Sequence, residues 1–169
     1  YVEQVESGLT RLAAIYSSKL PPLIGPIRSA RISDIELLAQ YGRVGFAYSG
    51  AQSKLRPVLA SANLENLSAE RNPPSIYGKD PNRPGPVNMI LKPDLLLERA
   101  NAREETAIDR PTKAPWVFGD AKESQGIASI VKIKWPNARY ELRWNADLEK
   151  YLIYFADQPN LAASANTLQ

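Results

Sequence analysis

Cysteine and histidine are both absent from this 169-residue chain. Without them the chain has no thiol nucleophile, no Ser-His-Asp triad and no ordinary zinc or copper site. The phosphate-loop pattern G-x-x-x-x-G-K-[ST] and the dinucleotide pattern G-x-G-x-x-G are missing as well. No apolar run approaches the ~20 residues that a membrane-spanning helix needs. We therefore predict no cofactor and no metal, and a hydrolase built from this chain would have to rely on carboxylates.

The chain also carries little net charge, +3, and the excess is placed unevenly. Residues 1–60 hold seven Lys and Arg against four Asp and Glu, whereas residues 61–169 hold fourteen of each. Nucleic-acid-binding domains usually show a stronger basic cluster, so we predict no nucleic-acid partner. The bias is sufficient for a local anion site. Hydrophobic residues make up 44% of the chain and charged residues 23%, which is typical of a globular protein.

The first third of the sequence alternates between strand and helix patterns. The apolar run 10–17 predicts a buried strand, and residues 43–48 predict a second one. Between them, Ser33-Asp34-Ile35-Glu36 fits a capping box that opens a helix ending near Gly42. A further helix runs from about Ala51 toward Ala62, and Pro57 must kink or restart it. This order predicts an α/β domain in which the two strands pair in parallel.

The remainder is loop-rich and then strongly alternating. Residues 63–91 contain many Pro and Gly turns, and Pro93 begins a helix that ends near Asn101. Apolar and charged residues then alternate through three stretches separated by two turns, which predicts a three-stranded antiparallel meander. The predicted fold class is therefore α/β: a mixed sheet flanked by two or three helices, with this meander at its C-terminal end. We predict one domain over residues 1–156 and a flexible tail over 157–169.

Two segments carry a family resemblance: Val5-Glu6-Ser7-Gly8-Leu9-Thr10-Arg11 and Ile24-Gly25-Pro26-Ile27-Arg28-Ser29-Ala30-Arg31. They resemble the V-E-G-G-x-T-R and I-G-P-V-R-S-A-R segments of the YerB-like family of predicted bacterial lipoproteins, a family of unassigned biochemical function. The resemblance implies an extracytoplasmic setting with a lipid anchor outside this chain, an opening strand before Tyr1, and a second domain after it. The chain departs from the family at Ser7, where a glycine is usual, and at Asn88, where the family has P-H-N.

The segment Arg28-Ser29-Ala30-Arg31, hereafter the RSAR segment, is the candidate ligand site. It precedes a predicted helix start, where free backbone N–H groups and two guanidinium groups together suit a carboxylate or phosphate. Alternatively, these arginines pair internally with Glu6 or Asp34 and hold the loop. The predicted ligand-binding set has seven members: Glu6, Arg11, Arg28, Ser29, Arg31, Asp34 and Asn88.

Three functions remain open from the sequence. The favoured one is a non-catalytic cell-envelope module that binds an anionic or polar envelope ligand through the RSAR segment. The second is a carboxylate-dependent hydrolase acting on cell-wall glycan, with Glu6 and either Asp34 or Asp80 as the acid pair. The third is a structural spacer for protein–protein contacts.

Two further groups of side chains have both a binding and a structural interpretation. Tyr77, Asn82 and Arg83 share the Pro-rich loop with Asn88 and could line a polar groove. The three tryptophans could stack on a sugar ring, although a tryptophan on an alternating strand is more often part of a core.

Overall fold

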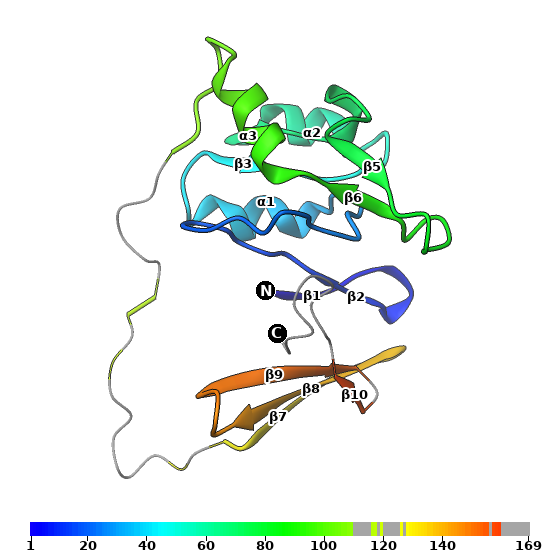
Figure 1. Ribbon diagram of the computed structural model, residues 1–169, viewed down its shortest axis with the longest axis vertical. Helices are drawn as coiled ribbons and strands as arrows, with labels where there is room; N and C mark the ends of the chain where they lie inside the picture. The colour runs from blue at the N-terminus through cyan, green and yellow to red at the C-terminus, as the bar shows by residue number, and fades with distance from the viewer. Residues whose placement is uncertain (110–115, 118, 120–125, 127, 156, 160–169) are drawn as a thin grey trace. The chain divides into compact units, whose positions relative to one another are not determined.

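The computed structural model describes residues 1–109, 116–117, 119, 126, 128–155 and 157–159. Its contacts divide the chain into two compact units (Figure 1). The helical unit spans Ile15–Val117, and the sheet unit combines Tyr1–Ala14 with Phe118–Gln169. Within the described residues the fold is mixed α/β, with three α-helices and four small sheets. The single domain over 1–156 and the tail over 157–169 stay predictions.

A parallel strand pair forms the centre of the helical unit. Strand β3 (Val44–Phe46) pairs in parallel with β4 (Leu64–Asn66), and α2 (Arg56–Ser61) lies between them in the chain. The strand predicted over 43–48 is therefore confirmed. Pro57 lies in the first turn of α2, so the predicted restart of the helix is confirmed too. β4 is a strand that the sequence reading missed.

The parallel partner predicted for β3 was wrong. The run 10–17 forms only the short strand β2 (Thr10–Leu12), which pairs antiparallel with β1 (Val2–Gln4). The 3-10 helix η1 (Glu6–Gly8) reverses the chain between them, with Ser7 at a φ of 61°. That left-handed conformation favours glycine, which the family resemblance places at this position. Leu12, Ile15 and Tyr16 are exposed, so this run is no buried strand.

The helix α1 (Ile32–Ala39) begins earlier than predicted. Its N-cap is Arg31 rather than Ser33, and the carboxylate of Asp34 accepts a hydrogen bond from the Arg31 backbone N–H at 2.6 Å. The capping box therefore uses Asp34 as the third helical residue in place of Glu36. The last helix, α3 (Pro93–Asn101), opens with Pro93 and confirms its prediction.

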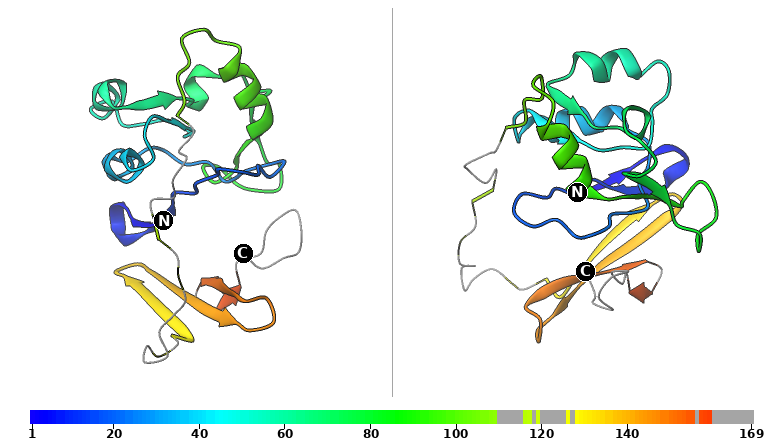
Figure 2. Two further views of the ribbon diagram at one scale, coloured as in Figure 1. Left: turned by 90° about the vertical axis from the view of Figure 1, so that its left-hand side faces the viewer. Right: turned by 45° about the horizontal axis from the view of Figure 1, so that its top comes forward.

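Two hydrophobic clusters support the helical unit (Figure 2). The smaller joins Ala30, Tyr48 and Leu59, with contributions from α1 and β3. The larger includes Leu67, Tyr77, Leu91, Leu96 and Ala100. Its strands are β5 (Tyr77–Lys79) and β6 (Met89–Leu91), which pair antiparallel.

The predicted meander is confirmed in the sheet unit. β7 (Ile130–Trp135), β8 (Ala138–Asn145) and β9 (Lys150–Phe155) are antiparallel neighbours, and β10 (Gln158–Pro159) adds a fourth strand beside β9. The turn between β7 and β8 contacts η1: the Asn137 backbone N–H donates to the Gly8 carbonyl at 3.2 Å. A Cβ at Gly8 would lie 2.9 Å from Cβ of Pro136, so this contact requires a residue without a side chain. None of the helices in the described ranges has the length and apolar character to cross a bilayer.

Candidate functional site

The arginines of the RSAR segment bond to backbone carbonyls of their own unit. Arg28 Nη1 donates to the Pro86 carbonyl at 2.6 Å. Arg31 Nη1 donates to the carbonyls of Ala30 at 2.9 Å and of Ser29 at 3.2 Å. These bonds correspond to the internal, loop-holding interpretation of the segment, although the partners are carbonyls rather than the predicted carboxylates.

The position where an anion would meet the start of α1 already holds a carboxylate. Asp34 is 8% exposed and accepts from the Arg31 N–H. The RSAR segment is also fixed by its backbone, because the Ser49 N–H donates to the Arg28 carbonyl at 3.0 Å and the Ala30 N–H to the Gly50 carbonyl at 2.9 Å. The segment thus lies alongside the chain that follows β3.

The other predicted site residues lie in several places. Glu6 in η1 and Arg11 in β2 belong to the sheet unit, whereas Asn88 belongs to the helical unit with the RSAR segment and Asp34. The Asn88 carbonyl accepts from the Asp80 N–H at 2.7 Å, within the loop between β5 and β6. Ligand binding by these seven residues stays a prediction.

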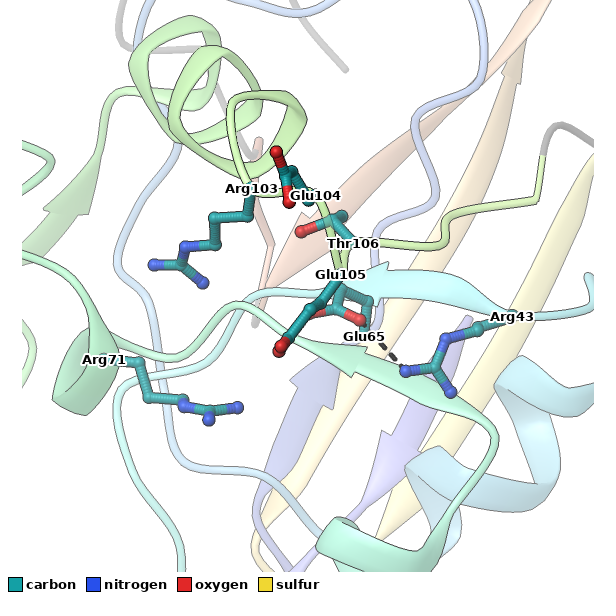
Figure 3. A pocket seen from close by; sticks show the side chains of 7 residues that line it. All are labelled: Arg43, Glu65, Arg71, Arg103, Glu104, Glu105 and Thr106. Carbon is teal, nitrogen blue, oxygen red and sulfur yellow. Dashed lines mark hydrogen bonds and ion pairs between the residues drawn. The ribbon is translucent and has the colours of Figure 1, made fainter.

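A different part of the helical unit presents an open hollow of about 670 Å³ (Figure 3). Its lining comes from four chain segments: the residue before β3, strand β4, the 3-10 helix η2 (Ala69–Arg71), and the turn after α3. The side chains are three arginines, three glutamates and one threonine: Arg43, Arg71, Arg103, Glu65, Glu104, Glu105 and Thr106. A second hollow of about 340 Å³ shares Arg43, Glu65 and Arg71 with the first.

One charge pair is made inside the hollow. Arg43 Nη2 lies 3.0 Å from Glu65 Oε2, and the Glu65 side chain is only 12% exposed. The Arg43 backbone is fixed by Asp109, whose carboxylate accepts from the Arg43 N–H at 2.7 Å and whose own N–H donates to the Arg43 carbonyl at 2.7 Å. Arg43 and Glu65 therefore form a pre-positioned wall, and their charges largely neutralise each other.

The other two arginines are less engaged. Arg103 Nη2 reaches Asn72 Oδ1 at 3.4 Å, which is a long hydrogen bond. Among the residues that the structure describes, the Arg71 guanidinium has neither a salt bridge nor a hydrogen bond, although its backbone N–H is held by the Ser68 carbonyl at 3.1 Å. Figure 3 shows the Arg71 side chain entering the hollow from η2 and Glu105 entering it from the turn after α3. A rigid backbone thus presents an exposed cation.

Two buried tyrosines stabilise the chain that precedes η2. The Tyr77 hydroxyl donates to the Leu67 carbonyl at 2.5 Å, and burial raises the pKa of Tyr77. Burial also raises the pKa of Tyr48, while hydrogen bonds with Ser68 and Asn66 act in the opposite direction. The predicted role of Tyr77 in lining a polar groove was wrong, because its ring belongs to the larger core cluster.

The sequence reading missed Arg71 and Arg103. Arg71 lies in the stretch interpreted as loop, and Arg103 in what looked like a surface connection. A usable signal was present only in Pro73-Pro74, which ends η2, and in the predicted end of α3 near Asn101. Neither signal indicates that the two arginines face the same hollow, because that depends on β4.

Comparison with known proteins places this geometry in a family. The sequence profile "Protein of unknown function (DUF3048) N-terminal domain" matches residues 1–106. The chain belongs to this family. Its fold is similar to the crystal structure of YerB from Bacillus subtilis, with a TM-score of 0.79 at 19% identity. That match covers 99% of this chain and 56% of YerB, so the chain spans little more than half of that protein. No curated protein matches the chain.

The family assignment confirms the resemblance inferred from the RSAR segment and from Val5–Arg11. Both segments lie inside the matched range 1–106. The structural similarity extends further, over the β7–β10 sheet, which the family profile does not reach.

Proposed function

We propose that this chain is a non-catalytic ligand-binding module of the bacterial cell envelope. The proposed setting, outside the cytoplasm and attached through a lipid anchor beyond this chain, is supported by the resemblance to YerB-like lipoproteins. The proposed binding site is the hollow of the helical unit. The observation that carries it is Arg71, an exposed cation on a fixed backbone that faces a polar cavity.

The charges of the hollow favour a ligand that is itself of mixed charge. Because Arg43 and Glu65 pair with each other, Arg71 and Arg103 remain as cations and Glu104 and Glu105 as anions. Charge-assisted hydrogen bonds to such groups are among the stronger polar contacts in proteins. A soluble fragment of peptidoglycan with a stem peptide carries carboxylates and an amine, and it suits this lining better than a simple anion does.

The RSAR segment has a different role in this proposal. Its bonds to Pro86, Ser29 and Ala30 hold the chain that follows β3, and thereby the layer on which the hollow is built. Loss of Arg28 should lower stability more than affinity.

A titration of the protein with a soluble muropeptide tests the proposal. A ligand that binds only the folded state at one hundred times its Kd adds about 2.7 kcal/mol of stability, so the thermal midpoint rises. We expect the Arg71→Ala and Arg103→Ala variants to lose that rise while keeping the midpoint of the unliganded protein. The control is Arg56→Ala, because Arg56 is an exposed arginine paired with Glu70 and does not line the hollow.

A rise that persists in Arg71→Ala would contradict the site. No rise with muropeptide or with simple anions would instead favour the structural spacer.

A second candidate function, hydrolysis of cell-wall glycan, is favoured by three carboxylates lining one hollow. The acids predicted from sequence are otherwise engaged: Asp34 caps α1, and Asp80 lies 3.3 Å from Arg83. Glu104 and Glu105 are the remaining pair. Release of reducing sugar from peptidoglycan by the wild type, lost in Glu105→Gln, would establish this function; no release from either protein would exclude it.

A further inference from the structure

One face of the β7–β8 ribbon is basic. Residues two apart along a strand share a face, so Lys132 and Lys134 of β7 point to the same side. The register places Lys132 opposite Glu141, and Lys134 opposite Arg139, on the neighbouring strand. The three cations are exposed, and Lys132 and Lys134 alternate with the apolar residues of the other face.

The charges on this face are unequally satisfied. Glu141 lies 3.7 Å from Lys132 and 2.8 Å from Arg143, and Arg143 also pairs with Asp157 at 2.7 Å. Lys134 and Arg139, in contrast, take part in no ion pair or side-chain hydrogen bond within the described part of the chain. They stand directly opposite each other, and like charges in that relation destabilise a sheet. An unpaired pair of this kind indicates a missing anion.

Protection of an exposed sheet edge explains only half of this arrangement. β7 is an edge strand, and lysines on edge strands hinder unwanted strand pairing. Arg139 lies on β8, which has a neighbour on each side. A cation there does not protect an edge, so the Lys134–Arg139 pair needs another explanation.

We propose that the Lys134–Arg139 pair binds the phosphate groups of a linear phosphodiester polymer. Cβ atoms of directly opposed residues lie ~5 Å apart, so both side chains can reach one phosphate. Arginine contributes two parallel donors and lysine a point charge. Lys132 lies ~6.7 Å further along β7, where it can meet a second phosphate of the same chain.

The neighbouring acids favour a narrow polymer over a broad anionic surface. Glu141 and Asp157 flank Arg143 further along the same face. A lipid bilayer laid flat on this face would meet both carboxylates, whereas a single chain along the cations avoids them. This site belongs to the sheet unit alone and does not depend on the hollow of the helical unit.

Calorimetric titration with inorganic polyphosphate tests this inference. We expect Lys134→Gln/Arg139→Gln to bind roughly tenfold more weakly than the wild type, with a shallower dependence of affinity on salt. The matched control is Lys54→Gln/Lys79→Gln, which removes the same two charges from exposed positions of the helical unit and should bind as the wild type does. Because the Lys134–Arg139 repulsion disappears, the test variant should melt no earlier than the wild type.

Three results would overturn the inference. Equal weakening in the control variant would show that net charge alone is responsible. Tighter binding to phosphatidylglycerol vesicles than to polyphosphate would assign the face to a membrane surface. Tighter binding to a single-stranded oligonucleotide would assign it to nucleic acid.

Discussion

The helical unit contains two sets of arginines that differ in what surrounds them. Arg28 and Arg31 lie three positions apart in a conspicuous motif, and both bond to backbone carbonyls at 2.6–3.2 Å. Arg71 and Arg103 lie in unremarkable sequence on separate elements, and they face an open hollow. The motif therefore marks a structural joint, whereas the arginines that a ligand can reach are brought together only by the fold.

The difference shows why two neighbouring arginines are weak evidence for a binding site. A guanidinium is costly to bury without partners, so arginines near a chain reversal are readily used to satisfy carbonyls. In contrast, an exposed guanidinium on a fixed backbone loses less rotational freedom when a ligand binds. The comparison predicts opposite outcomes for substitutions in the two sets.

The largest effect is expected at the cap that joins the RSAR segment to α1. Asp34→Ala removes a buried carboxylate that accepts from the Arg31 N–H, and it should lower the unfolding free energy by about 2 kcal/mol. Urea denaturation measures this. Asp94→Ala is the matched control, because Asp94 is an exposed first-turn acid of α3 and should change stability by about 0.5 kcal/mol. Equal effects in the two variants would show that Asp34 is no more than a surface charge.

The next effect concerns the buried tyrosine below η2. Tyr77→Phe leaves the Leu67 carbonyl without its donor and should cost about 1–2 kcal/mol at neutral pH. Burial raises the pKa of Tyr77 above the ordinary value of 10.0, so its contribution is fully present below that pH and is lost as the pH rises above it. Denaturation between neutral and alkaline pH should show a steeper loss for the wild type than for Tyr77→Phe. Parallel curves would contradict the assignment.

A smaller effect is expected at Arg28. Its bond to the Pro86 carbonyl is solvent-accessible, so Arg28→Ala should lower the unfolding free energy by about 1 kcal/mol. Arg28→Lys keeps one charged donor and should recover part of that loss. If Arg28→Ala leaves stability unchanged but abolishes muropeptide binding, the RSAR segment is the ligand site after all.

The smallest effect on stability is expected at Arg71. Arg71→Ala removes an exposed side chain that has no polar partner among the described residues, so the unfolding free energy should change by less than about 0.5 kcal/mol. A loss above about 1 kcal/mol would show that Arg71 is structural, as Arg28 is.

Local signals made much of the fold predictable. Pro93 placed α3, Pro57 placed the start of α2, and strict alternation placed β7, β8 and β9. These elements are specified by chemistry within a few residues of the chain. The prediction failed where strands are three residues long, as in β2 and β4, because such strands are too short to show a period.

The candidate site was less predictable than the fold. The hollow depends on β4, η2 and the turn after α3, and its lining spans residues 43 to 106. Such a convergence depends on how the elements pack, which no local pattern records. The RSAR segment was correctly recognised as a family marker, since it lies in the range that the family profile matches, but that recognition says nothing about its chemistry.

The most direct test of this account compares Arg71→Ala with Arg28→Ala in one muropeptide titration followed by thermal unfolding. The account predicts that Arg71→Ala melts like the wild type without ligand and shows no rise with it. Arg28→Ala should melt earlier and still rise. The reverse pattern, with binding lost in Arg28→Ala and retained in Arg71→Ala, would contradict the central claim and return the site to the RSAR segment.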